Sequence, residues 1–307
     1  MYNIYSIQVQ LTRKCNQHCY MCRKYTWPQK EIDIFMLKKI FEKHPKATYT
    51  FSGGEPLEYT KLDELNNLLY EYNISYQVLT NLNYKLSSEQ FAFLMNADCI
   101  QVSFDGADEK TYNNVRNPIE NGFKVVTNNI DRLLENDKII KLNATISKRN
   151  YKNVYDIINF AYREYYAMGK VYLRFFPVHT HDDIKLNYEM EQKINEQLEL
   201  ALKDFGPTFM KNVIFVANMH RQEYIGKCFV KQHHLVIDED GIEYPCCRAI
   251  NDNGFDVEQK YSISHLENIE DENVLYDFCK ECDRYRKFNE NWKKIEIKVN
   301  NGEKVYL

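Results

Sequence analysis

Three cysteines close to the start of the sequence have a spacing that could hold a metal centre. Cys15, Cys19 and Cys22 follow one another as C-x3-C-x2-C, directly after an apolar segment at residues 4–11. Thiolates are soft ligands that suit iron–sulfur clusters or zinc. A cubane cluster held by three thiolates keeps one iron open for a substrate or co-substrate. A zinc site with a distant fourth ligand is the alternative.

Polar and glycine-rich segments recur at the ends of the next expected strands. Ser52-Gly53-Gly54-Glu55-Pro56 follows a strand expected at Ala47–Phe51. Its glycines allow close backbone approach to a ligand, and Glu55 can hold a cationic amine, although the segment alone could be a plain turn. Asn81 and Ser103 end the following two strands, and Arg116 comes shortly after, with forked donors that suit a carboxylate.

Together these motifs resemble the signature of the radical S-adenosylmethionine (SAM) enzymes. The resemblance implies a 4Fe–4S cluster on the three cysteines, whose open iron is chelated by the amino and carboxylate groups of SAM. An electron from the cluster cleaves SAM to methionine and a 5′-deoxyadenosyl radical in that family. Two positions depart from the family pattern. Met21 stands where an aromatic residue usually precedes the third cysteine, and Leu82 replaces the glycine of Thr-Asn-Gly.

The resemblance also implies which residues bind SAM. The Gly-Gly-Glu-Pro segment grips the methionine amino group, the serine and arginine lie near the carboxylate, and the aromatic residue is on the adenine side. The implied SAM-binding residues are Tyr20, Gly53, Gly54, Glu55, Asn81, Ser103 and Arg116. Structural roles without a ligand are the alternatives, because Asn81 could cap a turn, Ser103 could cap a helix, and Arg116 could form a surface ion pair.

A second set of cysteines lies in the C-terminal part of the sequence. Cys228 and Cys246 flank Asp238-Glu239-Asp240-Gly241, which predicts a hairpin with glycine at the turn, and Cys279 and Cys282 form a C-x2-C pair. Four thiolates close a tetrahedral site, so structural zinc is one reading. The pattern also resembles the twitch domain, a short form of the SPASM domain, which implies a second, auxiliary 4Fe–4S cluster.

Cys247 is left over beside Cys246. On an extended segment neighbouring side chains point to opposite sides, so Cys247 is expected to face away from the auxiliary cluster. The Tyr-Pro-Cys-Cys run resembles that of twitch-type peptide epimerases, in which the second cysteine donates a hydrogen atom to a substrate radical. A structural thiol is the alternative.

The elements that must position these residues alternate between strands and helices. Strands are expected at 4–11, 47–51, 75–79, 99–104, 139–146 and 171–176, with helices at 35–41, 62–72, 87–95, 123–134 and 154–165. This pattern predicts an α/β fold with a parallel sheet, either open or a partial barrel. The resemblance implies the partial (β/α)6 TIM-like barrel, at residues 1–180. A linker at 181–227 follows, with a helix expected at about 187–204 and a short strand near 213–216, and then an auxiliary-cluster, twitch-like domain at 228–307.

Composition excludes several classes of protein. The chain has 307 residues and a net charge of −4, which gives no nucleic-acid footprint. We expect no membrane span, since no apolar run approaches the required length. Nine cysteines, an odd count in metal-like clusters, indicate a reducing, cytoplasmic setting rather than disulfides.

These observations predict a radical SAM enzyme that abstracts hydrogen from a C–H bond and so oxidises or epimerises its substrate. Because fourteen residues precede Cys15, we expect no N-terminal peptide-recognition domain. The substrate is then a small molecule, a sugar, or a peptide presented by another protein. An electron donor such as flavodoxin or ferredoxin is expected. A zinc-stabilised binding or scaffold protein is the alternative from another class.

Overall fold

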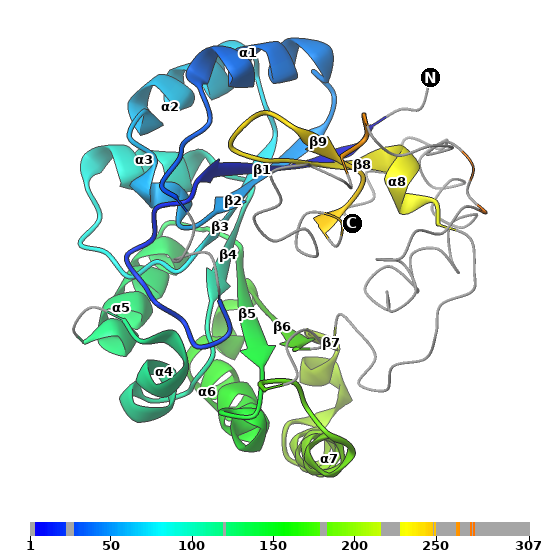
Figure 1. Cartoon of the computed structure of the whole chain (residues 1–307). Coiled ribbons are helices and arrows are strands. Elements are labelled where there is room, and N and C mark those ends of the chain that lie inside the picture. Colours follow the sequence, from blue (N-terminus) through cyan, green and yellow to red (C-terminus); the bar gives the residue numbers. More distant parts are fainter. Residues whose placement is uncertain are drawn as a thin grey trace.

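The structure is a computed structural model, and it describes residues 4–22, 28–118, 121–178, 183–215, 228–247, 249, 262–264, 271 and 273. The described chain is a curved sheet with helices along its outer side (Figure 1). The strands are β1 (Ser6–Thr12), β2 (Thr48–Gly53), β3 (Tyr76–Thr80), β4 (Cys99–Ser103), β5 (Ile140–Ile146), β6 (Val171–Pro177), β7 (Val213–Phe215), β8 (His234–Ile237) and β9 (Glu243–Tyr244). The helices are α1 (Ile34–Lys43), α2 (Leu62–Glu71), α3 (Ser88–Asn96), α4 (Glu109–Arg116), α5 (Gly122–Glu135), α6 (Val154–Tyr165), α7 (Tyr188–Met210) and α8 (Val230–His233). Short 3₁₀ turns lie at Pro56–Glu58, Tyr151–Asn153 and Tyr166–Met168.

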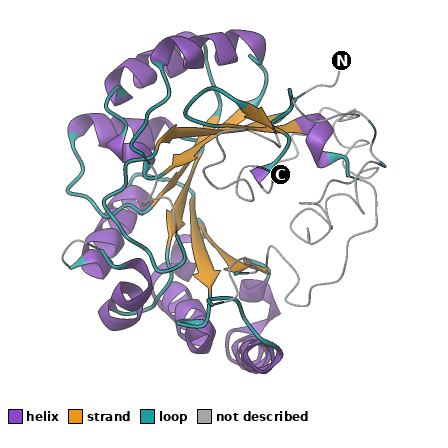
Figure 2. Ribbon diagram, viewed as in Figure 1, coloured by secondary structure: helices purple, strands orange, loops and turns teal. Residues whose placement is uncertain are grey.

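A row of buried apolar residues crosses the parallel part of the sheet. The order of strands is β7-β6-β5-β4-β3-β2-β1-β8-β9, and β1 to β7 pair in parallel. In register across six strands lie Val9, Phe51, Val78, Ile100, Ile140 and Val171, all buried. Figure 2 shows the helices along the outer side of the sheet, and this row belongs to the hydrophobic core that the sheet shares with them. The predicted α/β fold with a parallel sheet is therefore confirmed, and it has the partial-barrel form.

Hydrophobic spacing located most of the elements. The predicted helix at 154–165 has the bounds of α6, and Ser87 caps α3 through a capping box with Gln90. Helix α4 is not among the predicted helices; it begins after the Asp108 cap and ends at Arg116. This helix contacts the cysteine loop, because Val115 O accepts from Tyr20 N.

The sheet extends beyond the six predicted strands. β7 pairs with β6, and β8 pairs in parallel with β1, so both outer neighbours come from sequence after residue 180. The predicted hairpin is confirmed, since β8 and β9 pair antiparallel and Gly241 has a φ of 77°. The buried Arg13 side chain donates from Nε to Glu239 in the hairpin turn at 3.0 Å. The hairpin that follows Cys228 thus rests against the strand that leads to Cys15.

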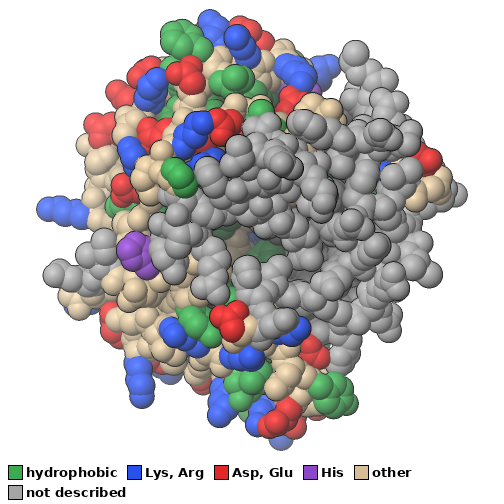
Figure 3. All heavy atoms as spheres, in the orientation of Figure 1, with side chains coloured by type: hydrophobic (Ala, Val, Ile, Leu, Met, Phe, Trp, Pro, Cys, Tyr) green, Lys and Arg blue, Asp and Glu red, His purple; other side chains and the backbone are tan. Residues whose placement is uncertain are grey.

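Some predictions fall on residues outside the described ranges. These include Cys279 and Cys282, and the tail at 295–307, whose sequence predicts a small closing hairpin or a paired strand. No helix of the described part of the chain is long and apolar enough to cross a membrane. On the visible face of the described helices, basic and acidic side chains are interspersed (Figure 3).

Candidate metal centre at the strand ends

The loop with Cys15, Cys19 and Cys22 is fixed at both ends of its described part. Its stem continues from β1, where Arg13 N donates to Lys30 O at 2.8 Å. At the other end Tyr20 N donates to Val115 O of α4 at 2.9 Å. The predicted position of the loop, at the C-terminal end of the first strand, is therefore confirmed.

Nitrogen donors from three directions point to the sulfur atoms. Gln17 N lies 3.5 Å and Asn81 Nδ2 3.8 Å from Cys15 Sγ. Arg116 Nη1 lies 3.7 Å from Cys19 Sγ. Such donors stabilise thiolates, which are the form that binds metal. Burial raises the pKa of Cys15 to about 12 and that of Cys19 to about 11, so these thiols need a bound cation to lose their protons at neutral pH. The donor set therefore fits a metal centre.

The three cysteine side chains are neighbours, because a charge on Cys19 or Cys22 raises the pKa of Cys15. In a cubane each thiolate binds a different iron, so three thiolates would leave the fourth iron open.

The two glycines of the Gly-Gly-Glu-Pro segment pack closely against the backbone at the start of the cysteine loop. Gly54 N donates to Thr12 O at 2.6 Å, and Glu55 N to Lys14 O at 2.7 Å. A Cβ at Gly53 would lie 2.4 Å from Thr12 O, and one at Gly54 2.2 Å from Lys14 O. Only glycine allows this approach. The close approach expected to serve a ligand is, in the described structure, an approach to the cysteine loop.

The Glu55 side chain of this segment is buried, and both of its carboxylate oxygens accept hydrogen bonds from the protein. Its Oε1 accepts from Thr80 Oγ1 at 2.6 Å and from Leu57 N at 3.1 Å, and its Oε2 accepts from Asn81 N at 2.6 Å. Burial raises the pKa of Glu55 to about 7, against the effect of these hydrogen bonds. Its carboxylate therefore ties the end of β2 to the end of β3.

Asn81 connects β3 to the cysteine loop. Besides its contact with Cys15, its Nδ2 donates to Asn16 Oδ1 at 2.7 Å, and its Oδ1 accepts from Asn83 N at 2.9 Å. Leu82, next in sequence, has a φ of 55°, the conformation that glycine would adopt without strain. Leu82 is fully buried, and this burial holds it there.

Arg116, at the end of α4, is engaged by two groups of the protein. Its guanidinium faces both Cys19 and the fully buried Asp105, which also accepts from Thr145 N at 2.6 Å. Burial disfavours the charged guanidinium, but Asp105 and Cys19 beside it raise the pKa of Arg116 well above its usual value. The ion pair expected as an alternative is present, and it is buried rather than exposed.

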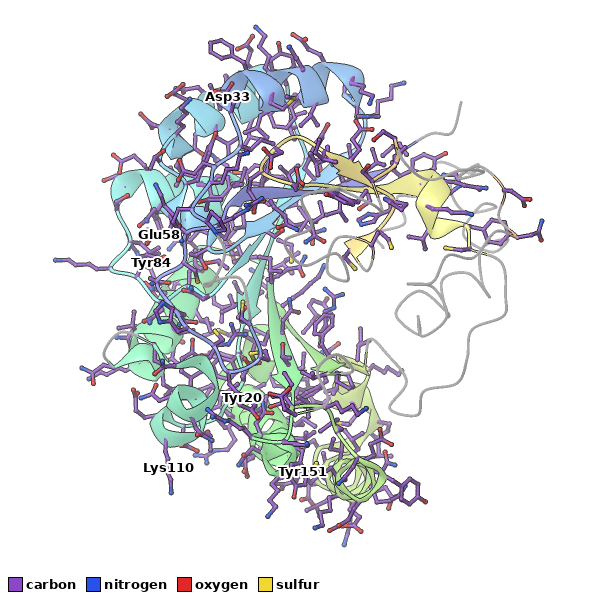
Figure 4. All side chains as sticks on the ribbon, in the orientation of Figure 1. Tyr20, Asp33, Glu58, Tyr84, Lys110 and Tyr151 are labelled. Atoms are coloured by element: carbon purple, nitrogen blue, oxygen red, sulfur yellow. The ribbon has the colours of Figure 1, made fainter. Side chains whose placement is uncertain are left out.

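Tyr20 lies beside α4, and Ser103 lies beside β5. Figure 4 shows Tyr20 in the lower half of the view, on the side of α4. The Arg149 guanidinium lies over the Tyr20 ring, 3.6 Å from its centroid, and donates to Asn114 O at 2.8 Å. Ser103 is half-buried at the end of β4, in register with Asn143. The structure therefore brings six of the seven implied SAM residues to the strand ends or to the loops that follow them, and the seventh, Arg116, ends α4.

The described part of the second cysteine set lies around the hairpin. Cys228 precedes α8, while Cys246 and Cys247 are both buried just after β9. The strand ends at Tyr244, so the alternation expected of an extended segment does not govern this pair.

Sequence reasoning missed Asp105 and Arg149. Asp105 belongs to Ser103-Phe104-Asp105-Gly106, and Gly106 packs against α4, where a Cβ would lie 2.3 Å from Tyr112 N. An acid followed by a glycine at a strand end was a signal of this close packing. Nothing local in the sequence marks Arg149 as a partner of Tyr20.

Comparisons with known proteins agree with this geometry. The Radical SAM superfamily sequence profile matches residues 9–161, and no curated protein matches the chain. Streptococcus suis SuiB bound to S-adenosylmethionine superposes with a TM-score of 0.66 and 15% identity, covering 92% of this chain and 72% of SuiB. SuiB bound to precursor peptide SuiA superposes with a TM-score of 0.63 and 14% identity, covering 92% of this chain and 72% of SuiB. The anSMEcpe structure with AdoMet and the Cp18Cys peptide superposes with a TM-score of 0.64 and 16% identity, covering 92% of this chain and 87% of anSMEcpe. At these identities the likeness concerns the fold. With the superfamily match over its strand-end motifs, the chain belongs to the radical SAM superfamily.

Proposed function

We propose that the chain is an enzyme that reductively cleaves SAM and uses the 5′-deoxyadenosyl radical to abstract hydrogen from a substrate C–H bond. The observation that carries this proposal is the convergence of Asn81 and Arg116 on the sulfurs of Cys15 and Cys19. The end of β3 and the end of α4 thus contact one cysteine loop. When bound there, a 4Fe–4S cluster supplies the electron for SAM cleavage.

The residues around the loop have two proposed roles. Tyr20, Gly53, Gly54, Asn81 and Ser103 are proposed to contact SAM. Glu55 and Arg116 are proposed as positioning residues instead, because their charged groups already bind other parts of the protein. Glu55 holds Asn81 in place, and Arg116 holds Cys19.

The substrate class is proposed to be a peptide, ahead of a small molecule or sugar. SuiB and anSMEcpe, which share the fold, are described with bound peptides. Flavodoxin or ferredoxin would supply the electron, and the cysteine pattern supports a cytoplasmic setting.

A second cluster is proposed on Cys228, Cys246, Cys279 and Cys282, of which the last two lie outside the described residues. Two reaction outcomes follow from this set. Electron transfer to the auxiliary cluster gives net oxidation, and hydrogen return from Cys247 gives epimerisation. The buried position of Cys247 suits either role.

The variant Cys247→Ala separates the two outcomes once a substrate is in hand. An epimerase loses its product while SAM cleavage continues, whereas an oxidase keeps its product. The solvent isotope is the second readout, since deuterium enters the product of an epimerase alone.

The zinc alternative is tested by metal analysis after anaerobic purification. We expect about eight irons and about eight sulfides per chain, from two 4Fe–4S clusters. Replacement of Cys15, Cys19 and Cys22 by Ala is expected to leave about four of each. Stoichiometric zinc without sulfide would contradict the proposal.

A further inference from the structure

The inner face of the sheet is polar. Side chains alternate along the strands, so that Ile100, Val102 and Leu142 face the helices and are buried in the core. The residues between them include Gln101, Lys141 and Asn143. Closed (β/α) barrels fill their interior with branched apolar side chains. The polar inner face here therefore calls for a function.

Hydrogen bonds join five of these inner residues into one network. Arg174 Nη1 donates to Gln101 Oε1 at 3.1 Å, and Lys141 Nζ lies 3.4 Å from Gln77 Oε1. Because cations only donate, both glutamine oxygens must be the acceptors. Gln101 Nε2 then donates to Gln77 at 3.0 Å, and Asn143 Nδ2 donates to Gln101 Oε1 at 3.2 Å. The two cations thus fix the direction of every amide in the network.

One acceptor is left over by this arrangement. With its Nδ2 committed to Gln101, Asn143 must present its carbonyl oxygen on the other side. Asn143 is 7% exposed, and its Oδ1 has no hydrogen-bond partner among the described residues. A buried acceptor without a donor is unfavourable. The orphaned oxygen therefore marks the place of an N–H or O–H donor from a bound molecule.

Among the residues of strands β1 to β7 that the structure describes, all charged side chains have one sign. Strands β1 to β7 contain two charged residues, Lys141 and Arg174, and no Asp or Glu. Arg174 pairs in register with Asn143, and Lys141 lies two residues before Asn143 on the same face. Two cations beside each other in a partly buried site favour an anion as a bound partner.

We propose that this inner face binds an anionic, oxygen-bearing group of the substrate, held by Arg174 and Lys141, with a neighbouring N–H or O–H bonded to Asn143 Oδ1. This inference rests on the proposed function, because it places the substrate in the barrel of a radical enzyme. An acidic or phosphorylated residue within a peptide has both of these groups: an anionic, oxygen-bearing side chain and a neighbouring N–H. Arg174 and Lys141 would then be specificity-determining residues.

The test uses three small probes that share an N–H but differ in charge. N-acetyl-glutamate amide, N-acetyl-glutamine amide and N-acetyl-phosphoserine amide are titrated into the anaerobically reconstituted protein with SAM, and binding is followed by calorimetry. We expect an anionic probe to bind at least about tenfold more tightly than the neutral one, as for one charge-assisted contact. The glutamate and phosphoserine probes distinguish a carboxylate from a phosphate ligand.

Variants show where the preference comes from. Arg174→Gln and Lys141→Gln are each expected to reduce the preference for the anion, and Asn143→Leu to weaken all three probes alike. Lys170→Gln is the matched control, because it removes the same charge from an ion pair with Asp137 just before β6. Circular dichroism checks that each variant is folded.

Several results would overturn the inference: binding of none of the probes, equal binding of the charged and neutral probes, or an unchanged preference in folded Arg174→Gln and Lys141→Gln. Formation of 5′-deoxyadenosine without substrate is measured on the same samples. If that reaction fails while the anion preference stands, the proposed function fails and the binding site remains. If the reaction succeeds while the preference is absent, this inference alone fails.

Discussion

Arg116 Nη1 lies 3.7 Å from Cys19 Sγ, and the same guanidinium forms an ion pair with the fully buried Asp105. Hydrogen bonds to ligand sulfurs and nearby positive charge set the reduction potential of an iron–sulfur cluster. Both effects favour the reduced cluster, because reduction adds negative charge beside the guanidinium. Arg116 is therefore placed to raise the potential through a ligand.

Replacing Arg116 should lower this potential. In Arg116→Gln we expect the midpoint of the cluster to fall by about 60 mV, which corresponds to about 1.4 kcal/mol of lost stabilisation of the reduced form. Redox titration followed by electron paramagnetic resonance measures it. Because an unpaired buried Asp105 costs about 3–5 kcal/mol, the effect of Arg116→Gln is measured in the Asp105→Asn background, so that both proteins lack the opposing charge of Asp105 near Cys19. Arg132→Gln, whose guanidinium stacks on Phe91, is the control. Equal midpoints in iron-loaded Asp105→Asn and in the double variant would contradict this role.

Glu55 should make the stability of the apoprotein depend on pH. Burial raises the pKa of Glu55 to about 7, from an ordinary value near 4.5. Between these values the folded state holds a proton that the unfolded state has lost, so the contribution of Glu55 to stability is present below about pH 4.5 and declines as the pH rises to about 7. In Glu55→Gln this decline should disappear. Urea denaturation of both proteins across that range measures the difference. Parallel stability curves for the two proteins would refute the prediction.

Gly53 should tolerate no side chain. In Gly53→Ala the new Cβ would lie 2.4 Å from Thr12 O, so the stem of the cysteine loop must move. Gly169→Ala is the matched control, since Gly169 also has a positive φ but no atom within 4 Å of its Cβ. We expect Gly169→Ala to cost about 1 kcal/mol from backbone strain and Gly53→Ala to cost more by about 2 kcal/mol. Iron content after reconstitution should fall for Gly53→Ala alone. Equal losses for both variants would remove the argument for close approach.

Leu82→Gly tests whether burial outweighs backbone strain. Leucine at a φ of 55° carries about 1–2 kcal/mol of strain, which glycine would relieve. Removal of a fully buried leucine side chain costs about 2–5 kcal/mol. The substitution towards the family's glycine should therefore destabilise the protein by about 2 kcal/mol in urea denaturation. A more stable Leu82→Gly would show that strain is the larger effect.

Local patterns in the sequence predicted the elements that are amphipathic, such as α6, and the motifs that lie on one loop, such as the three cysteines. They did not predict α4, because its eight residues contain few apolar positions and its signal is the capping box of Asp108 and Thr111. The pairing of β8 with β1 had no local signal either, since it joins residues that are far apart in the sequence. The partner of Arg116 could not be predicted from the sequence either, because a SAM carboxylate and the Asp105 carboxylate suit the same guanidinium equally well.

The central claim is that the loop of Cys15, Cys19 and Cys22 holds a cluster that reduces SAM. The most direct measurement is the formation of 5′-deoxyadenosine when the anaerobically reconstituted protein is reduced in the presence of SAM. We predict 5′-deoxyadenosine and methionine in equal amounts from the wild type, and neither from Cys19→Ala, while Cys99→Ala, which changes a buried cysteine on β4, keeps the activity. An iron-loaded wild-type protein that leaves SAM intact, or a Cys19→Ala variant that cleaves SAM like the wild type, would contradict the account.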